Sequence, residues 1–127
     1  MIKEAVISII IVVTIFGLEM FTQNFTKETV SEITATFEVL KEAIIKEDED
    51  KIKETVERLR SEWEGKYDKL AYYLEHDELE KVDTAIVRMK SYIETKNFSE
   101  AVAELEDGKF VLEHIKDKNA FNLQNIF

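Results

Sequence analysis

The chain has 127 residues, of which 45% are hydrophobic and 35% charged, and a formal net charge of −10 at pH 7. It contains no Cys, no Pro and only three Gly. Disulfides and thiol chemistry are therefore excluded, and the composition favours an all-α fold, because Pro and Gly are the residues that helices tolerate least. The acidic surface would repel phosphate backbones, so we expect no binding to nucleic acid.

The chain begins with an apolar segment, "AVISIIIVVTIFGL" (residues 5–18), that carries no charge. As a helix these residues reach about 21 Å, short of the roughly 30 Å hydrocarbon core of a bilayer. Extension through Met20 and Phe21 gives a largely apolar segment, residues 5–21, near the lower limit for a span. It has no polar stripe, unlike the helices that follow. We predict a membrane anchor of the signal-anchor type in residues 1–25, which contacts the bilayer through residues 5–21.

Two other interpretations of this segment stay open. A cleaved signal peptide needs small residues at its cleavage site, and "GLEMFTQNF" (residues 17–25) offers none. The segment could instead form a buried core helix, which would make the chain a wholly soluble bundle. If it is an anchor, Lys3 and the terminal amine favour a cytoplasmic N-terminus, with the acidic domain outside the cytoplasm.

Residues 26–127 are predicted to form an acidic domain with two amphipathic helices in its first half. The first begins with a capping box at Thr29 and Glu32. "KEDEDK" (residues 46–51) is interpreted as a connection whose acids favour the start of the next helix, where Gly65 permits a kink or a close contact. Apolar residues recur every three or four positions in both helices: Val30, Ile33, Phe37, Leu40 and Ile44, then Ile52, Val56, Leu59, Trp63, Tyr67, Leu70 and Leu74.

Two more amphipathic helices are predicted in the second half of the domain. Asp77, with Glu80 three residues later, is expected to cap the third helix, and Asn97 the fourth. Gly108 is expected to break the fourth helix, and the tail "NAFNLQNIF" (residues 119–127) to dock on the bundle. Short links between amphipathic helices predict an up-and-down bundle of about four helices.

The two histidines each end a Leu-Glu-His triplet, at residues 74–76 and 112–114. The second and fourth helices of an up-and-down bundle run parallel, so both triplets are expected at the same end. There Glu75, His76, Glu113 and His114 could hold a divalent metal. Histidine near a helix end is also favourable without a metal, and the inward Glu-x-x-His spacing of bundle metal sites is absent. We therefore assign these four residues only as a candidate metal site and expect no cofactor.

Trp63, Tyr67, Tyr72 and Tyr73 gather near the end of the second helix, and their helical spacing favours packing over ligand recognition. The sequence contains no phosphate loop, nucleophile–base set or nucleotide fingerprint. We expect that the protein is not an enzyme, and no small-molecule substrate is identified.

Several segments carry a resemblance to a known family. They are Trp63, "YYLEHDELEKVD" (residues 72–83), Ile86, Arg88, "FSEAVAEL" (residues 98–105), "LEHI" (residues 112–115) and the terminal "LQNIF". They resemble an uncharacterised bacterial family of short, single-pass membrane proteins with a helical domain of unknown function. The resemblance covers roughly residues 30–127 and implies a membrane-tethered helical domain without assigned catalytic residues. "FSEAVAEL" and the preceding helix also resemble, faintly, a tetratricopeptide hairpin, which would suggest a protein-binding surface.

Together these observations predict a membrane-tethered helical domain at the bacterial cell membrane. We expect it to act in an envelope complex, by binding a protein partner or by self-association. The alternatives are a metal-binding or metal-dependent bundle that uses the two Leu-Glu-His ends, or a wholly soluble bundle.

Overall fold

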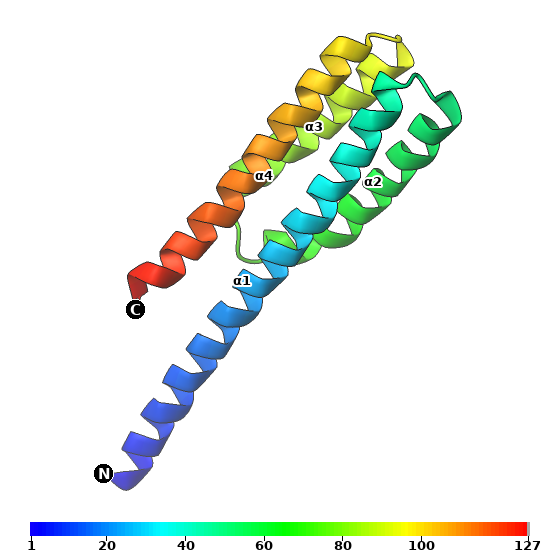
Figure 1. The fold of residues 1–127 in the computed structure, drawn as a ribbon. Coiled ribbons are helices and arrows are strands. Elements are labelled where there is room, and N and C mark those ends of the chain that lie inside the picture. Colours follow the sequence, from blue (N-terminus) through cyan, green and yellow to red (C-terminus); the bar gives the residue numbers. More distant parts are fainter. Residues whose placement is uncertain (127) are drawn as a thin grey trace.

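The computed structural model describes residues 1–126, and side chains as far as residue 120. It consists of four helices, which confirms the all-α prediction: α1 (Ile2–Ile45), α2 (Glu49–Ala71), α3 (His76–Glu94) and α4 (Phe98–Ile126). Consecutive helices run in opposite directions, and α4 returns to the side of the bundle from which α1 projects (Figure 1). α1 packs on α2 and α4, and α3 packs on α4, whereas α2 approaches α3 at few places. The described backbone is thus an up-and-down bundle in which α2 and α4 are diagonal.

The predicted anchor and the first predicted helix of the bundle form one helix rather than two. α1 has 44 residues and extends about 66 Å, and only its C-terminal half lies within the bundle (Figure 1). The predicted capping box at Thr29 is wrong, because Thr29 is an interior, buried residue of α1. No Gly or Pro lies between Gly17 and Gly65, so no helix-breaking residue separates the apolar segment from the domain.

The apolar residues of the predicted helices form one core. The five apolar residues predicted to form the seam of the first helix of the domain are at most 3% exposed, which confirms that prediction: Val30, Ile33, Phe37, Leu40 and Ile44. They meet apolar residues of the other three helices, including Leu59, Trp63, Leu79, Val82, Met89, Ala101, Leu105, Leu112 and Ile115. Burial of this seam holds the C-terminal half of α1 in the bundle.

The α1–α2 and α3–α4 turns lie at the same end of the bundle and have the same pattern of hydrogen bonds. In the α1–α2 turn, the Asp48 N–H donates to Ala43 O and the Glu47 N–H to Ile44 O. In the α3–α4 turn, Asn97 and Lys96 make the equivalent bonds to Tyr92 O and Ile93 O. Both patterns are Schellman motifs. The residue with a left-handed backbone conformation is Glu47 (φ 53°) in one turn and Lys96 (φ 57°) in the other. Glycine usually occupies this position and marks such a turn in a sequence, and neither turn has one.

The predicted connection at residues 46–51 is confirmed. The Asp48 side chain accepts a hydrogen bond from the Lys51 N–H, and Glu49 and Asp50 occupy the first turn of α2. Asn97 directly precedes α4, as predicted. The prediction for Asp77 is wrong, because α3 begins at His76 with Glu75 at the N-cap position, and no side chain caps it. Docking of the tail concerns side chains beyond residue 120, outside those that the structure describes.

The glycines play other roles than expected. Gly65 has open space around it, so the predicted close contact is wrong. Gly108 does not break α4, which runs through it. A Cβ at Gly108 would lie 3.1 Å from Phe37 Cε2 and 3.4 Å from Ala85 Cβ. Gly108 is therefore the point at which α4 packs closely against α1 and α3.

Candidate functional site

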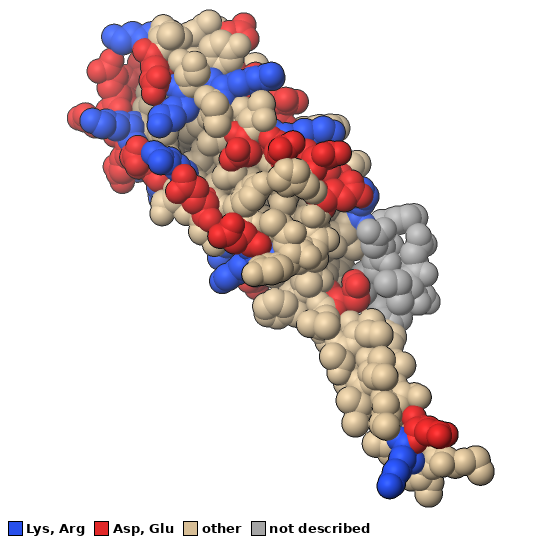
Figure 2. Space-filling model, turned by 180° about the vertical axis from the view of Figure 1, so that it is seen from behind, with Lys and Arg blue, Asp and Glu red and all other residues tan. Residues whose placement is uncertain are grey.

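The N-terminal half of α1 exposes its apolar side chains on every face. Ile9 is 62% exposed and Val13 63%, and none of the most apolar 18-residue window of this helix is buried. This half of the helix shows almost no charge between its tip and the bundle, where acidic and basic side chains gather (Figure 2). Among the described residues, α1 is the one helix long and apolar enough to cross a membrane, by length and composition.

The exposure of these apolar side chains tests the interpretation of residues 5–21 as a buried core helix. A core helix of a soluble bundle would be mostly buried, and this segment is not, so it is not a core helix of the bundle described here. The hydroxyl of Thr14 donates to Ile10 O at 2.8 Å, which satisfies a polar group inside the apolar run. The segment therefore needs no water along its length to satisfy this side chain.

Packing begins where the apolar segment ends. Phe25 is partly buried and Thr26 fully buried, and the Tyr73 hydroxyl from the α2–α3 turn lies 2.7 Å from Thr26 Oγ1. The same hydroxyl donates to Thr22 O at 3.2 Å. Burial raises the pKa of the Tyr73 phenol. The α2–α3 turn is thus fixed to α1 at Thr22 and Thr26, within about one and a half helical turns of Phe21.

The four candidate metal ligands lie at one end of the bundle, and each contacts a residue outside the set of four. Glu75 accepts from Lys118 at 2.9 Å, and His76 lies 3.0 Å from Glu80. Glu113 pairs with Lys116 at 2.9 Å, and His114 lies 3.6 Å from Glu78. Each member thus has its own partner, and none of the four pairs with another of the set.

Lys118 pairs with one of the four candidates, Glu75, and with the neighbouring Glu78, which lies 3.5 Å from its ammonium group. The hydrogen bond from Lys118 lowers the pKa of the Glu75 carboxyl, and the same bond raises the pKa of Lys118. Within the described part of the chain, no three acidic or histidine side chains gather in an arrangement that could hold a metal ion. This geometry gives the metal hypothesis no support.

An apolar groove runs between α2 and α3, the neighbouring helices that pack least closely. The end of the groove nearest the two Schellman turns has a volume of about 360 Å³. From there the groove continues past Val56 and Lys90 toward Trp63. The sequence analysis did not identify this groove. The spacing of apolar residues places Val56 and Ile93 on inward faces, but it does not show that the helices diverge there.

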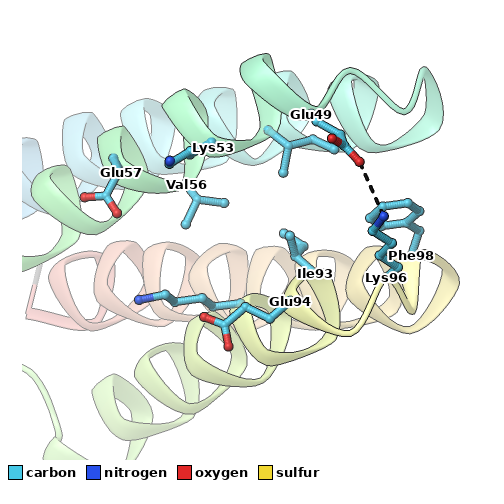
Figure 3. A pocket seen from close by; sticks show the side chains of 10 residues that line it. Glu49, Lys53, Val56, Glu57, Ile93, Glu94, Lys96 and Phe98 are labelled. Carbon is cyan, nitrogen blue, oxygen red and sulfur yellow. Dashed lines mark ion pairs between the residues drawn. The ribbon is translucent and has the colours of Figure 1, made fainter.

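The groove has an apolar floor and a charged rim (Figure 3). Val56 and Ile93 extend toward each other from α2 and α3, and Phe98 closes the end. The Lys96 ammonium and a Glu49 carboxylate oxygen are 3.7 Å apart across that end. The rim carries both signs of charge, from Glu49, Lys53, Glu57, Lys90, Glu94 and Lys96. This composition suits an apolar ligand with little net charge at its edges.

The aromatic cluster of α2 divides into packed and exposed members. Trp63 is buried, its indole N–H donates to Asp83 at 3.2 Å, and its ring meets Tyr67 edge-on. Tyr73 is partly buried, as described above. Tyr72 is 89% exposed, so the expected packing is wrong for that residue.

One family model matches this chain. It is described as a domain of unknown function, DUF4363, and it covers residues 20–126. The chain belongs to the DUF4363 family. The DUF4363 domain includes α2, α3, α4 and the part of α1 from residue 20 onward, and it begins near the end of the apolar segment. No curated protein and no solved structure matches the chain.

Proposed function

We propose that this chain is a membrane-anchored binding protein of the bacterial cell membrane, without enzymatic activity. Residues 5–21 cross the bilayer once, and the DUF4363 domain lies outside the cytoplasm. There it binds a protein partner through the groove between α2 and α3 in an envelope complex. The observation that carries the proposal is the exposed apolar half of α1, which continues without a break into the core of the domain.

The anchor is supported by the exposed apolar surface of α1, which would face water if no membrane covered it. Soluble monomers rarely expose a large continuous apolar surface, and such a surface marks a membrane or a partner. All faces of the helix are apolar, which suits lipid on every side better than a partner on one side. The orientation rests on Lys3 and the terminal amine, which favour a cytoplasmic N-terminus.

The position of the groove supports the binding role. It opens at the end of the bundle beside Ile45, about 36 Å along α1 from Phe21. Because α1 is one helix, the groove is held at a fixed height above the anchor. An occupant that brings a few apolar side chains, such as an amphipathic helix, would match the floor formed by Ile52, Val56 and Ile93.

Flotation of the full chain with phospholipid vesicles tests the anchor. We expect the protein to float with the vesicles and to resist alkaline extraction. Protein that stays in the dense aqueous fraction without detergent would contradict the anchor and favour the soluble alternative.

Photocrosslinking in membranes of the native host tests the groove. A photoreactive residue in place of Lys53, on the rim, is expected to give a discrete product that Val56→Asp abolishes. The control places the photoreactive residue at Ala35, an exposed position of α1 away from the groove. Equal products from both positions, or a product unaffected by Val56→Asp, would contradict binding at the groove. Two differently tagged copies distinguish self-association from a second protein.

A further inference from the structure

A group of aromatic and basic side chains from α1, α2 and the α2–α3 turn lies where the apolar segment ends. We call it the collar and define it as Phe21, Phe25, Lys66, Lys69 and Tyr72. The rings of Phe21 and Phe25 stack with their centroids 6.3 Å apart. The ammonium groups of Lys66 and Lys69, from α2, lie 5.3 Å and 5.8 Å from the centroid of the Phe25 ring. The collar therefore joins the start of the bundle to the apolar segment.

Tyr72 is unusual among the four tyrosines. It is 89% exposed, whereas the other three are partly buried. Its neighbour Tyr73 is bonded to α1 at Thr22 and Thr26, so the turn that carries Tyr72 cannot move far from that level. The fold thus presents an exposed tyrosine next to the end of the apolar segment.

The depth of this level follows from the helix rise. The polar headgroup layer adds about 5 to 8 Å to each side of the hydrocarbon core, which corresponds to three to five helical residues. If the core ends at Phe21, the headgroup layer extends over residues 22–26. Thr22 and Thr26, which hold Tyr73, bracket that range.

We infer that the collar rests in the headgroup layer of the bilayer, with Tyr72 inserted as an interfacial anchor. Tyrosine is enriched at this depth because its ring is apolar and its hydroxyl is polar, and lysines extend their ammonium groups to the same level. The occupant is lipid because the collar continues directly from the apolar segment. This inference rests on the proposed membrane anchor and adds a second contact, made by the α2–α3 turn.

The contact would fix the height of the domain. A helix that crosses a bilayer alone can slide and tilt to match its thickness. A turn that is bonded to α1 and also seated among headgroups opposes both movements. The end of the groove beside the α1–α2 and α3–α4 turns would then be held at a constant distance from the membrane.

Quenching of tryptophan fluorescence by brominated lipids tests the inference in the full chain. The variants Ile9→Trp, Tyr72→Trp and Ile45→Trp are reconstituted into phosphatidylcholine vesicles with bromines at shallow or deep acyl positions. Ile45 is exposed at the far end of the bundle and serves as the matched control. The signal of buried Trp63 in the native chain is subtracted. We expect shallow bromines to quench Tyr72→Trp several-fold more than Ile45→Trp, and deep bromines to quench Ile9→Trp most.

Each of the other outcomes would overturn the inference. If Ile9→Trp is quenched and Tyr72→Trp resembles Ile45→Trp, the collar is overturned and the anchor stands. If Tyr72→Trp is shielded from aqueous acrylamide but not quenched by lipid, protein covers it, which also overturns the inference. If no variant is quenched, the anchor itself fails, and the collar fails with it.

Discussion

The two halves of α1 share one backbone and differ in what surrounds them. In residues 5–18 the side chains are almost all apolar, on every face of the helix, and exposed. After Thr26, apolar residues recur every three or four positions and are buried against the other helices, while polar residues between them face outward. The comparison shows that secondary structure does not mark the boundary between an anchor and a domain. The boundary lies in the pattern of side chains.

The difference also explains why the domain needs its own core. Burial against α2 and α4 stabilises the C-terminal half in water, whereas the N-terminal half needs only an apolar solvent. Substitutions that affect one half should therefore leave the other half intact. The predictions below test this independence, from the largest expected effect to the smallest.

Phe37→Ala should have the largest effect, and only on the bundle. Phe37 is 2% exposed and packs against Gly108, so its truncation should lower the free energy of unfolding by about 3 to 5 kcal/mol. Thermal unfolding of the full chain in detergent, followed by circular dichroism, measures this change. Flotation with vesicles should be unchanged, and its loss would show that the halves are coupled.

Ile10→Lys should affect only the anchor. A lysine at the centre of a membrane helix costs about 2.5 to 3.5 kcal/mol, which a segment this short can hardly compensate. We expect a large loss of vesicle-bound protein and no change in the unfolding midpoint of the bundle. Ile45→Lys is the matched control, since Ile45 is as exposed but lies outside the anchor. Equal flotation of both variants would contradict the difference between the halves.

Two glycine substitutions should change stability in opposite directions. Gly65→Ala places a Cβ in open space and improves helix propensity, so it should stabilise the bundle by about 0.8 to 1.0 kcal/mol. Gly108→Val forces a branched side chain against Phe37 and Ala85 and should destabilise it by about 1 to 3 kcal/mol. Chemical denaturation of both variants measures the pair. Stabilisation by Gly108→Val would show that α4 does not pack closely there.

Tyr73→Phe should have the smallest effect, at the junction of the two halves. It removes the hydroxyl that bonds Thr22 O and contacts Thr26, at a cost of about 0.5 to 1.5 kcal/mol. Hydrogen exchange should quicken in the α2–α3 turn more than in the core. Unchanged exchange in that turn would mean that the hydroxyl does not hold the corner to α1.

Much of the fold could be predicted from the sequence because the spacing of apolar residues along a helix shows which face of the helix is buried. Phe37 and Leu59, for example, belong to the predicted apolar seams, and both are buried. The helix starts at Thr29 and Asp77 were wrong because capping residues also occur inside helices. Gly108 was misread because a glycine that ends a helix and one that admits a neighbouring ring look alike in a sequence.

The candidate sites were less predictable because they depend on the relative positions of helices. The shared Leu-Glu-His triplets suggested a convergent set, but Glu75 pairs with Lys118, whose role no triplet indicates. The groove depends on the divergence of α2 from α3, which no local pattern records. Tyr72 and Tyr73 are adjacent and identical, yet only the fold shows which of them is exposed.

Single-cysteine labelling along α1 tests the central claim most directly, because the chain has no cysteine of its own. Variants at each position from 6 to 45, in vesicles, are treated with a membrane-impermeant maleimide. We predict uniform protection through residues 6–18, on all faces, and then protection that alternates with a period of about 3.6 residues through residues 27–45. Labelling of residues 6–18 as fast as that of exposed Ser31 would contradict the claim that one continuous helix joins a membrane span to a bundle.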